Sequence, residues 1–198
     1  MTQRFAVPLA VLLAAPALAF AQAYPTKPIR MVIPFAPGGI DVTARMVLPR
    51  MTEDLGQSIV IENRPGAGGL TGSAVVAKSE PDGYTVLMNA SGPLLVAPLL
   101  LKKVPFDTLR DFTPITVLVR NLNVVAVTGD LPVNTVKELL EFAKRNPGKL
   151  SYGTAGIGTN QHLEGEMFNR AGGTDLVHVP YKGFGQVMQD LAGGRIAS

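Results

Sequence analysis

The chain of 198 residues contains no cysteine. The absence of thiols excludes a disulfide framework, a thiolate metal site and a lipid anchor on an N-terminal cysteine. Basic residues are scattered: the formal net charge is +3, and Lys and Arg stand next to each other only at 102–103 and 144–145. A net charge this small, carried by basic residues this scattered, argues against a nucleic-acid-binding surface, so we predict no nucleic-acid partner.

Long apolar runs are missing too, apart from one near the N-terminus. A short basic start at 1–4 precedes an apolar run at 5–20, which is shorter than the ~20 residues that a membrane span needs. Small residues follow at 21 and 23. This order predicts a secretory signal peptide at 1–23, cleaved before Tyr24, and therefore a periplasmic protein. An uncleaved membrane anchor is the alternative, and Pro8 and Pro16 argue against it.

Beyond Tyr24, strand-like and helix-like segments alternate, which predicts an α/β fold with parallel sheets. The helix at 135–146 is the most clearly marked, because Thr135 and Glu138 form a capping-box pattern and Pro147 stops it. The predicted strands are 29–35, 58–62, 84–89, 113–119, 123–128, 150–153 and 176–181, and the predicted helices are 41–55, 69–78, 92–101, 135–146, 159–171 and 184–191.

The last residues, 193–198, resemble the approach to a further strand. A final strand–helix unit with no strand after it leaves an apolar sheet edge and a thin core. The sequence therefore predicts that the C-terminal part of the fold is incomplete.

The most informative stretch is 34–41, Pro-Phe-Ala-Pro-Gly-Gly-Ile-Asp, between a predicted strand and a predicted helix. Such a turn gathers backbone N–H groups at a helix start, and these bind anions because they lack partners and carry partial positive charge. Gly38 and Gly39 could equally form only a tight turn, with Asp41 as the helix cap. Both interpretations hold together if a ligand uses the loop N–H groups and Asp41 stabilises the loop.

A second loop, Gly-Thr-Ala-Gly-Ile-Gly-Thr-Asn at 153–160, has the same strand–glycine–helix order. It lacks the Gly-Lys-Ser/Thr ending of a phosphate-binding P-loop, and neither it nor the glycine-rich stretch 66–72 fits a dinucleotide-binding pattern. We predict no nucleotide or other cofactor. Residues 154–159 remain a candidate anion site at a helix start.

Other chemically active residues give weaker signals. His162 and Glu166 lie four residues apart, as metal ligands can on a helix, but without a third ligand we predict no metal site. His178 fits a packed strand position. Tyr181 and Lys182 could close over a ligand, or Lys182 could simply be solvated. No Gly-x-Ser-x-Gly elbow and no marked carboxylate pair occur, so we predict no catalytic residues.

Eight motifs stand in order along the chain, at 24–30, 34–39, 55–57, 62–69, 81–84, 111–114, 178–183 and 190–191. Together they resemble those of one family, the substrate-binding receptors of tripartite tricarboxylate transporters, often called the Bug family. One difference lies in the glycine turn, where Ile40 alone separates Gly39 from Asp41, whereas family members usually have two residues there. Family chains also continue well beyond this length.

The resemblance implies a two-lobed periplasmic-binding-protein fold of type II, with parallel or mixed sheets flanked by helices. It places a first lobe at 24–124 and a partial second lobe at 125–198. A small carboxylate would bind between lobes that close around it, held by backbone groups. The site residues that it implies are Phe35, Ala36, Pro37, Gly38, Gly39, Ile40, Asp41, Ser91, Thr154, Ala155, Gly156, Gly158, Thr159, His162 and Tyr181.

We therefore predict a periplasmic solute-binding receptor, not an enzyme. Its ligand would be a dicarboxylate, tricarboxylate, aromatic acid or acidic amino acid, and its partner the membrane permease subunits of the transporter. Two alternatives stay open. One is an α/β enzyme that binds a phosphorylated or nucleotide ligand. The other is a truncated relic that binds nothing and acts as an interaction module.

Overall fold

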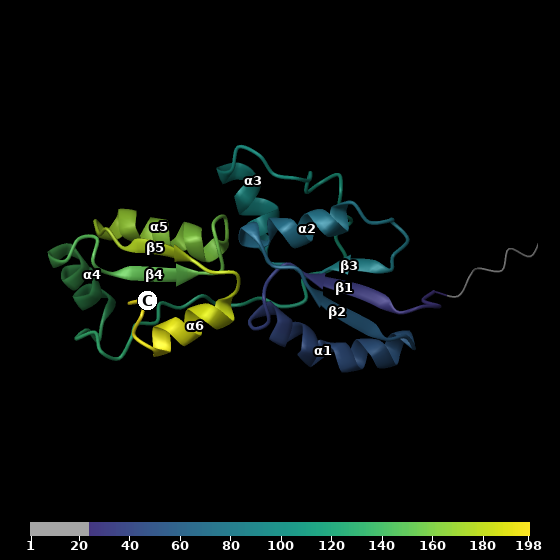
Figure 1. Ribbon diagram of the computed structural model, residues 1–198, viewed down its shortest axis with the longest axis horizontal. Coiled ribbons are helices and arrows are strands. Elements are labelled where there is room, and N and C mark those ends of the chain that lie inside the picture. The colour runs from purple at the N-terminus through teal and green to yellow at the C-terminus, as the bar shows by residue number, and fades with distance from the viewer. Residues whose placement is uncertain (1–23) are drawn as a thin grey trace, which may run out of the picture.

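The computed structural model describes residues 24–198 and consists of two α/β lobes side by side (Figure 1). Each lobe has a parallel sheet with helices on both faces. The predicted signal peptide lies outside the described residues. The elements are β1 (Ile29–Ile33), α1 (Ile40–Leu55), β2 (Ile59–Asn63), η1 (Ala67–Gly69), α2 (Leu70–Ala77), β3 (Thr85–Leu87), η2 (Gly92–Val96), α3 (Ala97–Leu100), α4 (Val136–Arg145), β4 (Ser151–Thr154), α5 (Asn160–Gly172), β5 (Val177–Pro180) and α6 (Phe184–Ala192).

The first lobe is built around β1, which lies between β2 and β3. Met31, Val32 and Ile33 are at most 4% exposed, and Ala44 of α1 packs against Met31 and Ile33. A central strand covered on both faces requires apolar residues at successive positions, which explains the unbroken apolar run in the sequence. The predicted strands at 29–35 and 58–62 are confirmed with small shifts at their ends.

The second lobe is built around β4 and β5, which pair in parallel. Leu139 and Ala143 of α4 share a core with Tyr152 of β4. The capping box of α4 is present: Thr135 Oγ1 accepts the N–H of Glu138 (3.2 Å), and the Glu138 carboxylate accepts the N–H of Thr135 (3.2 Å). The predicted helix and its start are therefore confirmed. The predicted boundary between residues 124 and 125 stays a prediction.

Two predicted strands, at 113–119 and 123–128, are wrong. The chain there is extended but belongs to no sheet, and Ile115 and Leu122 are 82% and 95% exposed. Apolar, β-branched residues favour a strand because they pack on a pleated, half-buried surface, and a strand also needs a hydrogen-bonded neighbour. Within residues 24–198 no strand lies beside this segment, so its composition alone does not form one.

The chain end follows the prediction more closely. The backbone of Ser198 accepts the N–H of Gly153 (2.7 Å), and the N–H of Ala197 donates to Ser151 (3.1 Å). These residues therefore lie along β4, as the approach to a further strand would. The N–H of Thr128, at the end of the extended segment, donates to Ala197 on its other side (3.0 Å).

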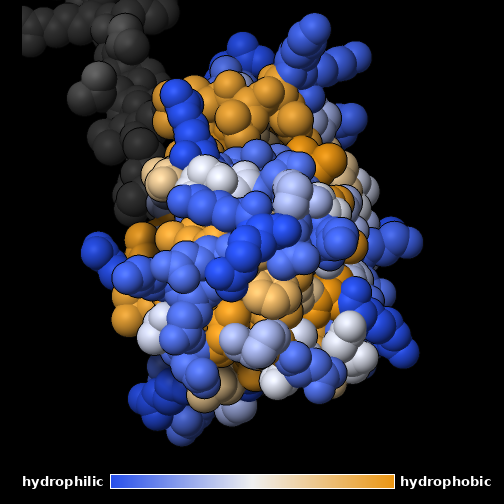
Figure 2. Space-filling view, turned by 90° about the vertical axis from the view of Figure 1, so that its left-hand side faces the viewer, coloured by the Kyte–Doolittle hydropathy of each residue, from blue (hydrophilic) through white to orange (hydrophobic). Residues whose placement is uncertain are grey.

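Figure 2 looks onto the second lobe from the side away from the first, where the surface is mainly hydrophilic with apolar patches between. Met167 and Val177 are exposed apolar side chains of this lobe, and Val177 belongs to β5 at a sheet edge. A two-stranded sheet leaves such positions uncovered. None of the helices within residues 24–198 has the length and apolar character needed to cross a bilayer.

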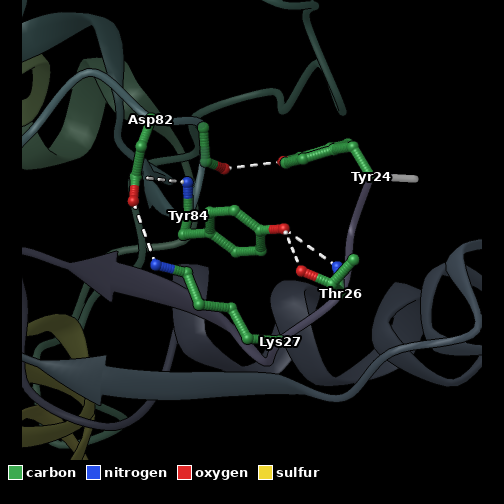
Figure 3. Close-up of polar contacts among 6 residues, drawn as sticks. Tyr24, Thr26, Lys27, Asp82 and Tyr84 are labelled. Atoms are coloured by element: carbon green, nitrogen blue, oxygen red, sulfur yellow. Dashed lines mark hydrogen bonds and ion pairs between the residues drawn. The ribbon is translucent and has the colours of Figure 1, made fainter. Parts of the chain in front are cut away.

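Contacts of Tyr24, Thr26 and Lys27 hold the first described residues against the turn before β3, and we call this group of contacts the clasp (Figure 3). Tyr24 donates its hydroxyl proton to a carbonyl of that turn (2.7 Å), and the Tyr84 hydroxyl accepts the N–H of Thr26 (2.8 Å). Lys27 pairs with Asp82 (3.1 Å) and lies 4.3 Å from the centre of the Tyr84 ring. The clasp fixes the chain just before it enters β1.

We expect Tyr84→Phe to lower the free energy of unfolding, because it removes the acceptor of the Thr26 N–H. Urea denaturation measures the change. Amide hydrogen exchange at Thr26 should accelerate in the same variant. An unchanged denaturation midpoint together with unchanged exchange at Thr26 would show that the clasp does not hold the segment.

Candidate functional site

Three loops that lead into helices meet between the lobes, and we call this junction the seam. The Gly38 loop (34–41) joins β1 to α1, the Ser91 turn (89–92) leads from β3 into η2, and the Gly156 loop (154–159) joins β4 to α5. The carboxyl ends of the strands in both sheets point at the seam (Figure 1). Ligands of open α/β sheets bind at this end of the strands.

The Gly38 loop is fixed by hydrogen bonds that leave several of its N–H groups free. Asn63 Nδ2 donates to the Phe35 carbonyl (3.0 Å), and the Asp41 N–H donates to Gly38 (3.0 Å). Gly38 and Gly39 have φ angles of +113° and +49°, which glycine adopts without strain. Within the described chain the N–H groups of residues 39, 40 and 42 have no acceptor. These groups are available to an anion at the start of α1.

Asp41 stabilises this loop but does not cap the helix. The cap position is Gly39, so the capping interpretation of Asp41 is wrong; its side chain is buried in the first turn and accepts two hydrogen bonds from Arg45 (2.9 and 3.2 Å). Hydrogen bonds from Arg45, assisted by Asn63, hold the pKa of Asp41 below its ordinary value although burial acts in the opposite direction. The charged carboxylate also accepts a hydrogen bond from the Gly38 backbone, and it leaves the N–H groups of residues 39, 40 and 42 unoccupied.

In the Gly156 loop, too, only some of the N–H groups have an acceptor within the described chain. The Thr159 hydroxyl accepts the His162 N–H (3.4 Å) and donates to the Gly156 carbonyl (2.7 Å), so Thr159 is the N-cap of α5. Thr154 Oγ1 accepts the Gly156 N–H (3.1 Å). Within residues 24–198 the N–H groups of 155, 157, 160 and 161 find no acceptor. A second set of free donors thus stands at the start of a second helix.

Among the described residues, two hydrogen bonds link a seam loop of the first lobe to the second lobe. The Ala36 N–H of the Gly38 loop donates to the Lys182 carbonyl after β5 (3.2 Å). The Asn160 side chain at the start of α5 donates to the Ser91 hydroxyl (2.7 Å). The Gly38 loop and the Ser91 turn of the first lobe are thereby both linked to the second lobe.

Glycines let the two backbones approach closely elsewhere along the seam. A Cβ atom on Gly68 would lie 2.1 Å from the Ile157 carbonyl oxygen, and one on Gly92 would lie 2.8 Å from Thr159 Cα. Side chains do not tolerate such distances from backbone atoms. Glycine at these positions is therefore required by the contact between lobes.

The chemistry that this arrangement offers is the binding of a small anion. Donors from two helix starts surround the seam, and none of its three loops contains Lys or Arg. Backbone N–H groups with partial positive charge bind a carboxylate without a formal cation. No group of three or more metal-ligating side chains occurs within residues 24–198.

Most of the predicted site residues lie in the three loops of the seam, and Tyr181 lies beside the Gly156 loop, because its N–H donates to the Thr154 carbonyl (2.9 Å). The Tyr181 hydroxyl donates to Asp190 of α6 (2.7 Å), so its polar end is already bound. His162 and Glu166 do not act together, since Glu166 accepts the hydroxyl of Tyr152 (2.7 Å). Sequence reasoning missed Gly68 and Gly92 as contact residues; the cluster of glycines at 66–72 was the available signal.

Volume alone does not locate this site. A hollow of about 510 Å³ lies between α1 and β2, away from the seam, and is lined by Arg45, Leu48, Pro49, Thr52, Ile59 and Ile61. It offers a single cation and mostly apolar atoms. Free N–H groups at a helix start carry partial positive charge toward an anion, and this hollow offers none.

Comparison with known proteins identifies the family of this chain. The model of the tripartite tricarboxylate transporter family receptor matches residues 43–198. The chain belongs to this family. Among curated relatives, a protein from the tcbD-tcbE intergenic region of Pseudomonas sp. strain P51 is 40% identical over 175 residues, which cover 88% of this chain and 52% of the relative. Protein BugT of Bordetella pertussis is 38% identical over 181 residues, which cover 90% of this chain and 55% of BugT.

Solved structures agree with the assignment to this receptor family. A periplasmic transporter is 47% identical with a TM-score of 0.83 over 88% of this chain and 59% of its own. An R. palustris protein solved with adipate is 38% identical with a TM-score of 0.85, over 88% and 58%. MatC of Rhodopseudomonas palustris with bound malate is 28% identical with a TM-score of 0.79, over 88% and 60%. The chain spans little more than half the length of these relatives.

We expect Asp41→Asn to destabilise the fold by about 1 kcal/mol near neutral pH, a value reduced because Arg45 is largely exposed. The folded-state pKa of Asp41 lies below the ordinary 3.8, so the stabilisation is complete above about pH 4 and is lost as the pH falls through the lowered pKa. The difference between wild type and variant in urea denaturation should therefore shrink in acid.

Asp54→Asn is the matched control, since Asp54 pairs with Arg50 on the same helix but is exposed. We expect this control to change the free energy of unfolding by no more than about 0.5 kcal/mol. If the two variants lower the free energy of unfolding equally at neutral pH, the buried Asp41 carboxylate stabilises the fold no more than an exposed carboxylate on the same helix does.

Proposed function

We propose that this chain provides the ligand-binding loops of a periplasmic receptor for a small organic carboxylate. The observation that carries the proposal is the pair of helix starts at the seam, one from each lobe, whose N–H groups lack acceptors within the described chain. The relatives solved with adipate and with malate support the choice of a carboxylate. Under this proposal, residues 24–124 act as the first lobe and 125–198 as part of the second.

The magnitudes fit a receptor of moderate affinity. Each helix start contributes about 0.3–1 kcal/mol to anion binding, and each charge-assisted hydrogen bond about 1.5–3 kcal/mol. A few such contacts support a dissociation constant in the micromolar range, about −8 kcal/mol, after the cost of ordering ligand and loops. Binding by both lobes also makes closure depend on the ligand.

The remaining roles follow from membership of the receptor family. The ligand-bound receptor would deliver its carboxylate to membrane permease subunits, and the chain would be exported to the periplasm by residues 1–23. No catalytic step is part of the proposal.

Isothermal titration calorimetry with a panel of acids tests the proposal. The panel contains malate, adipate, citrate, benzoate and glutamate, with ATP and NAD as arms for the enzyme alternative. We expect heat of binding with at least one acid and none with the nucleotides. Silence across all the acids would overturn the proposal and favour the non-binding relic, while heat only with a nucleotide would favour the enzyme.

Gly92→Ala should weaken binding of the best acid at least tenfold, about 1.4 kcal/mol, because the new Cβ meets the backbone of Thr159 in the other lobe. Gly92 has no left-handed φ, so the first lobe itself should fold normally. Calorimetry measures the affinity and circular dichroism the fold.

Gly129→Ala is the matched control, because a Cβ on Gly129 meets nothing within 4 Å. We expect its affinity to equal that of the wild type. Full affinity in Gly92→Ala would show that binding does not require the lobes to meet at this point.

A further inference from the structure

Behind the Gly156 loop, three rings from three different elements form a stack. His178 of β5 lies between Tyr152 of β4 and His162 of α5, with ring centroids 5.0 and 4.2 Å away and interplanar angles of 30° and 26°. These two histidines are the only ones in the chain. All of its imidazole groups therefore stand together, directly behind the loop that the proposed function assigns to the ligand.

Each histidine makes a hydrogen bond to that loop. His162 Nδ1 accepts the Gly158 N–H (3.3 Å), and His178 Nε2 lies 2.7 Å from the hydroxyl of Thr154. Thr154 in turn accepts the Gly156 N–H (3.1 Å). His162 binds the Gly158 N–H directly, and His178 contacts the Gly156 N–H through Thr154, so the two rings orient these two N–H groups. The free N–H of residue 157 lies between them in the chain.

The geometry requires a particular charge state. A ring nitrogen that accepts an N–H carries no proton, so Nδ1 of His162 is deprotonated in this arrangement. Burial, and then the neighbouring His162, lower the pKa of His178, while Glu166 acts in the opposite direction. Two further ionisable groups stand at the stack: Glu166, which accepts the Tyr152 hydroxyl (2.7 Å), and Tyr152, whose pKa is raised by burial and by Glu166. Tyr152 is the third ring of the stack. It stays neutral throughout the range in which histidines titrate.

We propose that His162 and His178 are positioning residues for the Gly156 loop, and that the loop holds an anion firmly only while both rings are neutral. A proton on His162 Nδ1 replaces an acceptor by a donor that faces the Gly158 N–H. A proton on His178 places a charge 4.2 Å from the centre of the other ring. Either change displaces the loop, so affinity for a carboxylate falls as the pH falls through the histidine range. This inference rests on the proposed function, because it concerns the same loop.

The binding test uses malate and adipate, titrated calorimetrically into the full chain between about pH 8 and pH 5.5, where histidine protonation changes. We expect the wild-type affinity to fall about tenfold over this range, the worth of one hydrogen bond. Protonation of the acids themselves affects wild type and variants alike, so the comparison between them removes it. A constant or rising wild-type affinity relative to the variants would overturn the inference.

Two substitutions at one position separate positioning from mere packing. His162→Asn keeps an oxygen acceptor near the place of Nδ1 but cannot titrate, whereas His162→Ala keeps neither property. We expect His162→Asn to bind more tightly than His162→Ala at about pH 8 and to lose the wild-type pH dependence. Equal binding by the two variants, or a pH dependence that survives in His162→Asn, would contradict the positioning role.

A ligand-free measurement keeps the inference testable if no acid binds. In nuclear magnetic resonance titrations the Gly158 amide of the wild type should shift with the midpoint of a histidine ring. The amide of Gly129, far from both rings in sequence and at a position where an added Cβ would meet nothing within 4 Å, serves as the control and should not shift. Independence of the Gly158 amide from both histidines would overturn the inference, whereas failure of every acid to bind would overturn only the proposed function.

Discussion

The seam depends on how closely two backbones from different lobes approach. Gly68 meets Ile157 and Gly92 meets Thr159 at distances where a Cβ atom would collide with main-chain atoms. Along the same junction, each lobe contributes one helix start with free N–H groups. A carboxylate has two oxygens and one charge, so donors from two sides bind it better than one helix start does.

Around this contact, polar groups hold the loops while leaving their donors unoccupied. The Asp41 carboxylate is bound to Arg45 and to the Gly38 backbone, and it leaves the N–H groups of residues 39, 40 and 42 free. Thr159 caps α5 with a hydroxyl that satisfies only the His162 N–H. On the far side of the Gly156 loop, the two histidines bind two more of its polar groups. Fixed loops with free donors lose little entropy when an anion binds.

The sequence predicted the local features well and the long-range pairing less well. The capping box at Thr135 and the strand–glycine–helix order of both loops depend on residues close in the chain, and they are present as expected. The strands predicted at 113–119 and 123–128 failed because a strand requires a neighbour, which local composition does not reveal. For the same reason His178 was expected only to be packed, and its contacts with His162 and Thr154 were not foreseen.

The sequence by itself determined the α/β class, the receptor family and the two glycine loops at helix starts, because periodicity, caps and ordered motifs are written in consecutive residues. The tertiary structure decided which loops face each other, which glycines touch the opposite lobe, and that the only two histidines stack behind the Gly156 loop. These facts depend on distances between residues far apart in the chain, and folding alone sets those distances.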